Sequence, residues 1–450
     1  MKTIFITIFQ GVEARNILRT DIYQKLVGTS HIRIVLFVNS QTKKEYYEKE
    51  FNGPNVVYEV VDNYTAKGLQ KLFGAIKFNL INTSTIDIKR NLAFNADKSQ
   101  VKFLRRYFFN RIFARRFFRR IIRWLDWHLV SENFFSHYFD KYQPDLIFLA
   151  HLFGGIEIAL LREARRRRIV TVGLINSWDK ITARAMVRLL PDWLVVHNNL
   201  IKDSAIKYVD MPEKRIVTAG APHFDYYFNE ERTLAGEFYK KWGLDRNKKT
   251  ILYLPVGRTF SDDDWNMLEF FNGLVSGGRL NFHCQVIVRF PPNDEVVVKE
   301  NYKNGFIFQT PGRRFSLKRG TDWDMNFDDL RDLADTLYYA DVVVSYASTM
   351  VIDAAIFDKP VINVKFERRH HSRNFVLWAY KVAHYQLVLK TGGVQLANSE
   401  KELVEWLNNY LKNPSLDRDG RKRLAEEQCW RLDGRAGERI ANFILELIKS

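Results

Sequence analysis

The chain has 450 residues, a hydrophobic fraction of 46% and a formal net charge of +17. This length and apolar content exclude a largely disordered protein and favour two folded domains. The two cysteines, Cys284 and Cys429, exclude a disulfide framework and a thiolate metal cluster, so we expect a reducing compartment. The excess positive charge predicts an anionic partner, which can be a phosphorylated substrate, an acidic lipid surface or nucleic acid.

The first ten residues, MKTIFITIFQ, have the pattern of a buried strand and not of a signal peptide. The longest apolar run, Leu146–Leu161, is interrupted by His151 and Glu157 and is shorter than the ~20 residues that cross a bilayer. We therefore expect a cytoplasmic protein without a transmembrane helix.

Apolar runs alternate with amphipathic stretches through the first half of the chain. This alternation predicts a doubly wound α/β domain with a parallel sheet. The expected strands are Thr3–Phe9, Ile32–Val38, Val56–Val61, Leu146–Ala150, Val170–Ile175 and Arg215–Thr218.

Polar residues follow three of these strands. Glu13 comes after the first strand, His151 after the fourth and Asp179 after the fifth. The carboxyl ends of parallel strands lie at one edge of a sheet, so these loops should converge. Asp179 stands beside Trp178, and partial desolvation by an indole raises a carboxyl pKa toward the range of a general base. We predict Asp179 as the base and His151 or Glu13 as its substitutes, whereas a hydrogen-bonded structural role is the alternative for His151.

The segment Lys102–Trp127 interleaves eight arginines with nine aromatic residues. Read as one helix, it has a broad arginine face, which suits an anionic membrane surface. A helix packed on its own domain with a solvated arginine face is the alternative. Nucleic acid is not predicted as a partner, because no known nucleic-acid module accompanies the segment. The opposite, apolar stripe of this helix should contain Phe103, Tyr107, Phe117, Phe118, Ile121 and Leu125.

A second domain is expected after the segment AGAPHFDYY, Ala219–Tyr227, where glycine and proline lead into charged sequence. The predicted domains are residues 1–225, which bind the acceptor, and 226–450, which bind a nucleotide donor. The strand Thr250–Pro255 delivers Gly257 and Arg258, and the strand Gln285–Phe290 delivers Arg289. Arginines at strand ends can contact a diphosphate in fork geometry.

The stretch ADVVVSYASTMVIDAAIFDKPVINVKF, residues 340–366, predicts two parallel strands, Asp341–Ser345 and Val361–Val364, joined by the helix Ala347–Phe357. Ser345, Ser348 and Thr349 stand where the helix begins. Unpaired backbone N–H groups at that point favour a phosphate. Asp353 follows Thr349 by one turn and can accept ribose hydroxyls. The alternative is that Ser348 caps the helix and Asp353 is solvated.

Two acidic groups qualify superficially as ligands for a hard metal: Asp262, Asp263 and Asp264 form one, and Asp322 and Asp324 the other. Neither lies in an amino-terminal nucleotide unit, so solvated loops are expected, with no metal and no cofactor.

The pattern ADVVVSYASTMVIDAA followed by KPVI resembles the donor-binding segment of GT-B glycosyltransferases and their relatives. These relatives include the non-hydrolysing UDP-GlcNAc 2-epimerases and the CDP-glycerol glycerophosphotransferases, which YLPVGR and DGRAGERI resemble in particular. The resemblance implies two facing Rossmann-like domains with parallel sheets and a last helix that can return to the first domain. The glycerophosphotransferases that this chain resembles have a Trp-His-Gly loop with a catalytic histidine. At the corresponding position this chain differs, because Trp178 is followed by Asp179.

Carried over by position, the resemblance implies donor phosphate at Ser348 and Thr349 and ribose at Asp353. It also implies basic groups near the diphosphate at Arg258 and Arg289, and no bound metal.

The resulting prediction is an inverting, metal-independent glycosyltransferase of cell-surface polysaccharide biosynthesis. It would move a sugar from a nucleotide-diphospho-sugar to a lipid-linked or glycan acceptor at the inner face of the membrane. Glycerophosphate transfer and sugar epimerisation are the enzymatic alternatives. A basic membrane- or nucleic-acid-binding protein with a vestigial nucleotide pocket is the non-enzymatic alternative.

Overall fold

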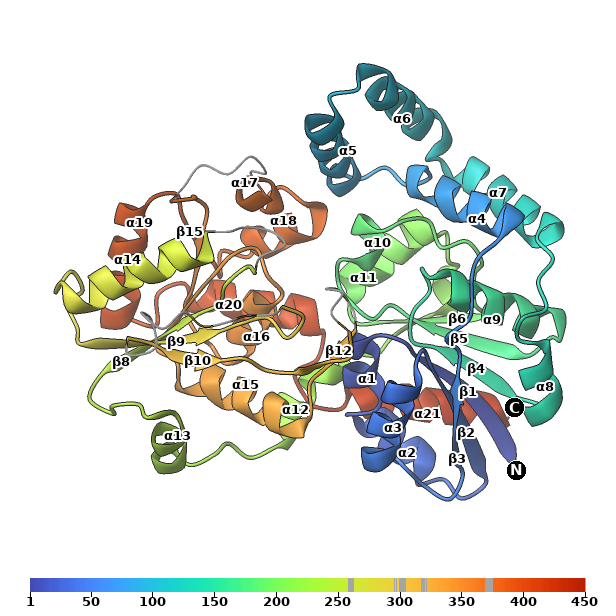
Figure 1. The fold of residues 1–450 in the computed structure, drawn as a ribbon, viewed down its shortest axis with the longest axis horizontal. Coiled ribbons are helices and arrows are strands. Elements are labelled where there is room, and N and C mark those ends of the chain that lie inside the picture. The colour runs from blue at the N-terminus through green and yellow to red at the C-terminus, as the bar shows by residue number, and fades with distance from the viewer. Residues whose placement is uncertain are drawn as a thin grey trace. The chain divides into compact units, whose positions relative to one another are not determined.

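In the computed structural model the chain forms two compact units, residues 1–226 with 429–450 (unit 1) and residues 227–428 (unit 2) (Figure 1). The structure describes residues 1–257, 263–294, 296, 298, 305–316, 320, 322–368 and 375–449. Each unit is built on one parallel sheet, so the predicted α/β class is confirmed.

The sheet of unit 1 has seven parallel strands in the order β3-β2-β1-β4-β5-β6-β7. Most of its residues are buried, because helices cover both faces and long β-branched and aromatic runs remain inside. Sequence patterning missed only one strand of this sheet, β6, which is four residues long. The strands are β1 (Lys2–Ile8), β2 (Ile32–Val38), β3 (Val56–Val60), β4 (Leu146–Leu149), β5 (Val170–Leu174), β6 (Trp193–Val196) and β7 (Ile216–Thr218).

The helices of unit 1 include those that follow β1, β4 and β5 at the carboxyl edge of the sheet. Others, from α4 to α7, form a lobe between β3 and β4 (Figure 1). They are α1 (Gly11–Ile17), α2 (Asp21–Val27), α3 (Gln41–Glu50), α4 (Gly68–Ile76), α5 (Ser84–Asp97), α6 (Gln100–Phe113), α7 (Arg116–Leu129), α8 (Ser136–Tyr142), α9 (Gly155–Arg166), α10 (Lys180–Ala183), α11 (Asn199–Ser204) and α21 (Ala436–Lys449).

The last helix, α21, packs in unit 1, and a buried carboxylate holds its first turn. Asp225 accepts hydrogen bonds from the backbone N–H groups of Ala436 (3.1 Å) and Gly437 (2.6 Å). Burial raises the pKa of Asp225 to about 6. Gly220 has a φ of +95°, and a Cβ there would lie 2.8 Å from the Ala436 side chain. The segments AGAPHFD and DGRAGERI, far apart in the sequence, therefore contact each other.

Unit 2 has six parallel strands in the order β10-β9-β8-β13-β14-β15. The expected strand, helix, strand unit is present as β13, α16 and β14, although α16 begins three residues later than predicted. The strands are β8 (Lys249–Tyr253), β9 (Cys284–Arg289), β10 (Ile307–Gln309), β13 (Val342–Ser345), β14 (Val361–Val364) and β15 (Gln395–Ala397), with an antiparallel pair, β11 (Arg313–Arg314) and β12 (Trp323–Asp324). The helices are α12 (Tyr226–Asn229), which begins at the unit boundary, α13 (Ala235–Trp242), α14 (Asp264–Ser276), α15 (Phe327–Tyr339), α16 (Met350–Ile356), α17 (Phe375–Ala379), α18 (Ala383–Lys390), α19 (Glu400–Lys412) and α20 (Arg418–Cys429).

The prediction of one helix across Lys102–Trp127 is wrong. The backbone leaves the helical conformation at Ala114 and Arg115, which separates α6 from α7. The Arg119 guanidinium stabilises the break, because its Nη1 donates to the Ala114 carbonyl oxygen at 3.3 Å.

The expected orientation of the arginine face is also wrong for α7. Arg119 and Arg123 are 4% and 9% exposed, whereas Phe117 and Trp124 are 67% and 60% exposed. The two buried arginines bind Asp210: Arg119 Nη2 donates to Oδ1 at 2.6 Å and Arg123 Nη1 to Oδ2 at 2.7 Å. Burial alone would raise the pKa of Asp210, but these hydrogen bonds hold it below its ordinary value. Arg119 and Arg123 thus face the domain and Phe117 and Trp124 face solvent, whereas Arg116 and Arg120 are exposed.

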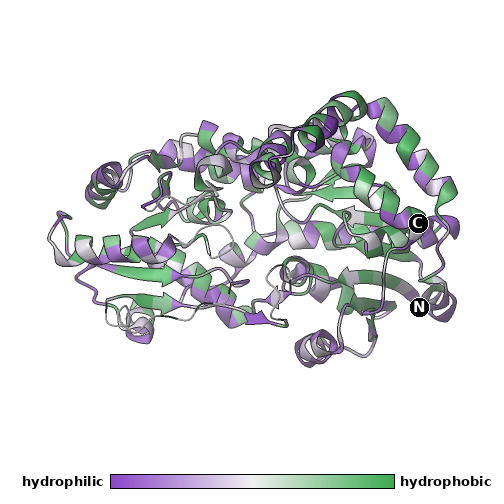
Figure 2. Cartoon of the chain, turned by 45° about the horizontal axis from the view of Figure 1, so that its top comes forward, coloured by the Kyte–Doolittle hydropathy of each residue, from purple (hydrophilic) through white to green (hydrophobic). Residues whose placement is uncertain are grey.

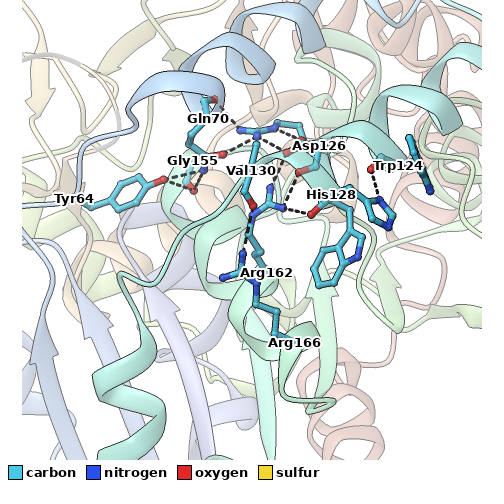
Figure 3. A network of polar contacts seen from close by, with 11 residues as sticks. Tyr64, Gln70, Trp124, Asp126, His128, Val130, Gly155, Arg162 and Arg166 are labelled. Atoms are coloured by element: carbon cyan, nitrogen blue, oxygen red, sulfur yellow. Dashed lines mark hydrogen bonds and ion pairs between the residues drawn. The ribbon is translucent and has the colours of Figure 1, made fainter.

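A second buried carboxylate, that of Asp126 in α7, joins α7 to α9 (Figure 3). Its Oδ1 accepts hydrogen bonds from Arg162 Nη2 at 2.6 Å and Arg188 Nη2 at 2.8 Å, and its Oδ2 accepts from Arg188 Nε at 2.6 Å. Arg188 Nη2 also donates to Gln70 Oε1 of α4 at 2.6 Å. Ionic groups without access to water therefore fix α4 and α7 to the rest of unit 1.

Exposed apolar residues lie among exposed arginines along the helices of the lobe. Among the described residues, no helix is both long enough and apolar enough to cross a membrane. Figure 2 shows hydrophobic and hydrophilic residues alternating along the helices at its upper right. We call the exposed apolar set the outer face of the lobe; it comprises Leu69, Leu72, Phe78, Val101, Leu104, Phe108, Ile112, Phe117, Ile121 and Trp124.

Candidate functional site

The loops after β1, β4 and β5 lie at the carboxyl edge of the unit 1 sheet, as parallel topology requires. A buried hydrogen bond joins two of them: Asn16 Nδ2 donates to the Asn176 carbonyl oxygen at 3.0 Å. Glu13 lies in α1, His151 follows β4, and Asp179 precedes α10.

Glu13 is fully buried, and its carboxyl group bends back onto the end of β1. Its Oε2 accepts hydrogen bonds from the backbone N–H groups of Phe9 (2.6 Å) and Gln10 (3.1 Å), whereas its Oε1 has no partner among the described residues. Burial, and then the charge of Glu157, raise the pKa of Glu13, and the two backbone hydrogen bonds oppose the shift only in part. Glu13 therefore favours the protonated form more than an exposed glutamate does.

Glu157 is the second buried carboxyl group at this edge, and it was not assigned to the site from the sequence. It lies in the first turn of α9, where burial raises its pKa. A Cβ at Gly154 would lie 1.9 Å from Glu157 Oε2, so the loop after β4 needs glycine there. A carboxylate in the long apolar run Leu146–Leu161 was the signal that could have identified it.

Lys180 opens α10 and is buried among these carboxyl groups. Burial lowers its pKa, and the charges of Asp179, Glu13 and Glu157 oppose that shift. The same lysine charge helps to lower the pKa of His151. Lys180 is thus within electrostatic reach of all three predicted catalytic residues, which places them in one polar cluster.

His151 is a buried imidazole that stays neutral. Burial, and then the charge of Lys180, hold its pKa well below the ordinary 6.5. Its Nδ1 has no hydrogen-bond partner among the described residues, and a hydrogen-bonded structural role stays the alternative for His151. A neutral imidazole with an unused nitrogen can accept a proton.

Asp179 is partly exposed, and its carboxylate accepts a hydrogen bond from Ser177 Oγ at 2.6 Å. Its backbone carbonyl accepts from Ala183 N at 2.9 Å and so closes the turn of α10. The base role of Asp179, and the substitute roles of His151 and Glu13, stay predictions.

Of the three hydroxyl groups in unit 2 that were predicted to bind phosphate, those of Ser345 and Ser348 make hydrogen bonds within the domain. Ser345 is fully buried, where its Oγ accepts from Asn363 Nδ2 at 2.9 Å and donates to the Tyr346 carbonyl oxygen at 3.2 Å. Ser348 Oγ accepts from Met350 N at 3.3 Å, which is the capping role named as its alternative. Thr349 makes no side-chain cap at the start of α16.

Asp353 is buried, so its solvated alternative is wrong. Its Oδ1 accepts a hydrogen bond from the Tyr227 hydroxyl at 2.5 Å. This contact ties α16 to α12. A ribose contact from the same carboxylate stays a prediction.

The loop after β8 is shaped by Gly257 and a buried carboxylate. Gly257 has a φ of +85°, which favours glycine, and its N–H donates to Asp264 Oδ2 at 2.8 Å. Burial raises the pKa of Asp264 to about 6. Asp263 Oδ2 accepts from Arg368 N at 2.7 Å. The expectation of solvated loops is therefore wrong for Asp263, Asp264 and also Asp324, all of which are buried.

Of the two arginines predicted near the diphosphate, Arg258 and Arg289, the structure describes only Arg289. Arg258 lies outside the described residues, as does Asp262. Arg289 is buried, with Nη1 donating to Gln309 Oε1 at 2.8 Å and Nη2 to the Asp329 carbonyl oxygen at 3.0 Å. Burial lowers the pKa of Arg289 to about 10. These contacts join β9, β10 and α15, so this side chain has a structural role in the sheet.

Among the residues that the structure describes, no group of three or more histidine, cysteine, aspartate or glutamate side chains is arranged to hold a metal ion.

The family described as CDP-Glycerol:Poly(glycerophosphate) glycerophosphotransferase matches residues 176–446, which is more than half of this chain. The chain belongs to this family. The predicted resemblance is thereby confirmed, and the matched residues contain Asp179 and all of unit 2. Glu13 and His151 precede the match, so the family assignment carries no information about them.

A curated relative is the teichoic acid glycerol-phosphate primase of Bacillus spizizenii (strain ATCC 23059 / NRRL B-14472 / W23). It is 25% identical over 198 residues, which are 44% of this chain and 45% of the relative. The chain thus matches about half the length of this primase.

Solved structures show the fold of the whole chain. The UDP-GlcNAc 2-epimerase from Neisseria meningitidis bound to UDP-GlcNAc has a TM-score of 0.56 and 11% identity, covering 99% of this chain and 100% of that chain. The wall teichoic acid polymerase TagF has a TM-score of 0.54 and 12% identity, covering 100% and 89%. With its two parallel sheets, this member of the glycerophosphotransferase family has the GT-B fold.

Proposed function

We propose that the protein transfers a polyol phosphate from a cytidine-diphosphate-activated donor, such as CDP-glycerol, to a hydroxyl group of a lipid-linked or cell-surface polymer. The observation that carries the proposal is the family match over residues 176–446. Sugar transfer was placed first from the sequence and glycerophosphate transfer second, and the family match reverses that order.

The donor would bind in unit 2, where Gly257, Ser348, Thr349 and Asp353 lie at or near the carboxyl edge of the sheet. Donor binding there is supported by the general rule that open parallel sheets bind nucleotides at this edge. Ser345 and Arg289 would support the loops from inside, because their polar groups already have protein partners.

In the proposed reaction the acceptor oxygen attacks the phosphorus that carries the polyol. A new P–O bond forms, the bond to the bridging oxygen breaks, and cytidine monophosphate leaves. The acceptor proton passes to a base in the unit 1 cluster, with Asp179 first and His151 or Glu13 as substitutes. Basic side chains and backbone N–H groups would stabilise the leaving phosphate without a metal ion.

Product analysis tests the proposal. The full chain is incubated with CDP-glycerol or with a panel of nucleotide-diphospho-sugars, each with a membrane fraction as acceptor and with EDTA in a parallel reaction. We expect cytidine monophosphate from CDP-glycerol and no loss of rate with EDTA. Release of a nucleoside diphosphate from a sugar donor would instead establish sugar transfer, and failure of every donor would favour the binding protein.

We also propose that the protein works on the cytoplasmic face of the membrane, held there by the outer face of the lobe. Phe117, Ile121 and Trp124 form an exposed apolar stripe on α7, and exposed Arg115 and Arg120 adjoin it. An interfacial helix buries such a stripe at the lipid boundary, and anionic head groups attract the arginines.

Vesicle sedimentation tests this contact. Wild-type protein should bind vesicles that contain phosphatidylglycerol, and this binding should weaken as salt screens the charges. It should bind phosphatidylcholine vesicles only weakly. The variant Phe117→Ser with Ile121→Ser should bind about tenfold more weakly, since it removes buried apolar area. The matched control, Leu234→Ser with Leu416→Ser, changes two exposed apolar residues of unit 2 and should bind normally. If both variants lose vesicle binding equally, the membrane contact does not lie on α7.

A further inference from the structure

A cavity of about 590 Å³ lies at the amino ends of β5, β6 and β7, the edge of the sheet opposite to Glu13 and His151. Its walls come from α7, α9 and the segments before β6 and β7. A cavity of this size accommodates a small ligand. Nothing in the transferase reaction proposed above uses it.

The cavity carries an excess of positive charge. Arg120, Arg165 and Arg215 line it, and none of them has a carboxylate partner among the described residues. The two carboxylates in the wall accept hydrogen bonds from other groups, and neither pairs with these three arginines. Asp210 is held by Arg119 and Arg123, and Asp192 Oδ2 accepts from Thr171 N at 2.9 Å and Thr171 Oγ1 at 2.7 Å. The three arginines therefore remain available to an anion.

Two of these arginines are held in place by stacking. The Arg165 guanidinium lies 4.6 Å from the centre of the Trp127 ring, and that of Arg215 lies 4.8 Å from the centre of the Trp193 ring. Stacking covers the face of a guanidinium and leaves its N–H edge free to donate. A phosphate oxygen is the acceptor that such an edge binds in fork geometry.

The cavity is continuous with the outer face of the lobe through one side chain. Trp124 lines the cavity and is also part of the exposed apolar stripe of α7 with Phe117 and Ile121. Arg120 lies one helical turn before Trp124, on the same side of α7. An anionic group bound at the arginines would therefore have an apolar surface directly beside it.

We propose that this cavity binds the phosphate head group of one anionic membrane lipid, whose acyl chains lie along the apolar stripe of α7. A soluble phosphate would satisfy the arginines alone, whereas a phospholipid satisfies both the arginines and the stripe. The proposal rests on the membrane contact described above and is independent of the transferase reaction.

Calorimetric titration of the full chain with monomeric dihexanoyl-phosphatidylglycerol, below its micellar concentration, tests the site. We expect saturable binding of one lipid. Two control ligands should each bind at least about tenfold more weakly. Dihexanoyl-phosphatidylcholine has the same chains without net charge, and inorganic phosphate has charge without chains. Equal affinity for the neutral lipid, or for inorganic phosphate, would overturn the proposal in favour of an apolar groove or a soluble-phosphate site.

Two triple variants with the same loss of charge locate the binding. R120Q/R165Q/R215Q should weaken lipid binding about tenfold or more, whereas R105Q/R106Q/R279Q, which removes three exposed arginines outside the cavity, should leave lipid binding unchanged. If the two triple variants weaken lipid binding equally, the proposed site is wrong. Thermal unfolding checks the fold of each variant, and R120Q alone, which loses no protein partner among the described residues, should still weaken binding about threefold. Loss of vesicle sedimentation with retained lipid titration would refute the membrane contact and keep the site.

Discussion

Asp179→Asn is expected to lower turnover by about 10² to 10⁴-fold while donor affinity stays near that of the wild-type protein. The change keeps the size of the side chain and the hydrogen bond from Ser177, but it removes the basic carboxylate. Turnover is measured by release of the nucleotide product, and donor affinity by calorimetry of the same preparation.

Three further variants are compared with Asp179→Asn. His151→Gln and Glu13→Gln test the substitute bases, and Asp353→Ala tests the donor site. Asp353→Ala should weaken donor binding, by about 1.5 to 3 kcal/mol for one lost charge-assisted hydrogen bond. Loss of turnover in His151→Gln but not in Asp179→Asn would reverse the two roles. Normal turnover in all three unit 1 variants would show that the polar cluster around Lys180 is structural.

The pH profile gives a second test of His151. Because burial and the Lys180 charge hold its pKa well below 6.5, a catalytic His151 would stay deprotonated through neutral pH. Activity limited by this group would therefore fall only when the pH drops well below 6.5. An acid limb near pH 6.5 would argue against His151 as the base.

Asp126→Ala is expected to destabilise unit 1 by about 3 to 5 kcal/mol, because it leaves two buried guanidinium groups without their carboxylate. Arg162 and Arg188 are almost completely buried, and each donates to Asp126. Urea unfolding, followed by hydrogen exchange in peptides of α7 and α9, measures the effect on this unit alone.

The matched control for the buried network is Asp140→Ala. Asp140 pairs with Arg167 at 2.5 Å, but its side chain is 65% exposed, so its loss should cost about 0 to 1 kcal/mol. If Asp126→Ala and Asp140→Ala shift unfolding by similar amounts, the buried network does not stabilise α7 in the way described.

The strands of both sheets were largely predictable, because a parallel strand buried on both faces appears as a continuous β-branched run. Val342–Ser345 and Val361–Val364 are examples, and their parallel pairing follows from the helix between them. Short strands such as Trp193–Val196 were missed because four residues give too little pattern.

The candidate site was predictable only in part. Glu13, His151 and Asp179 could be placed at one edge of the sheet, because topology alone brings loops after parallel strands together. Their protonation could not be predicted, because it depends on how deeply each group is buried and on the charge of Lys180. The same limit explains Ser345 and Arg289, whose partners Asn363 and Gln309 are distant in sequence.

Sequence by itself determined that α7 has a polar stripe and an apolar stripe, since helical spacing alone separates them. Only the tertiary structure decided which stripe faces the protein. Burial of Arg119 and Arg123 is favourable only where a carboxylate meets them, and that carboxylate, Asp210, lies about ninety residues away. Spacing within a helix contains no information about such a distant partner, so only the tertiary contacts decided that Arg119 and Arg123 face inward and Phe117 and Trp124 face solvent.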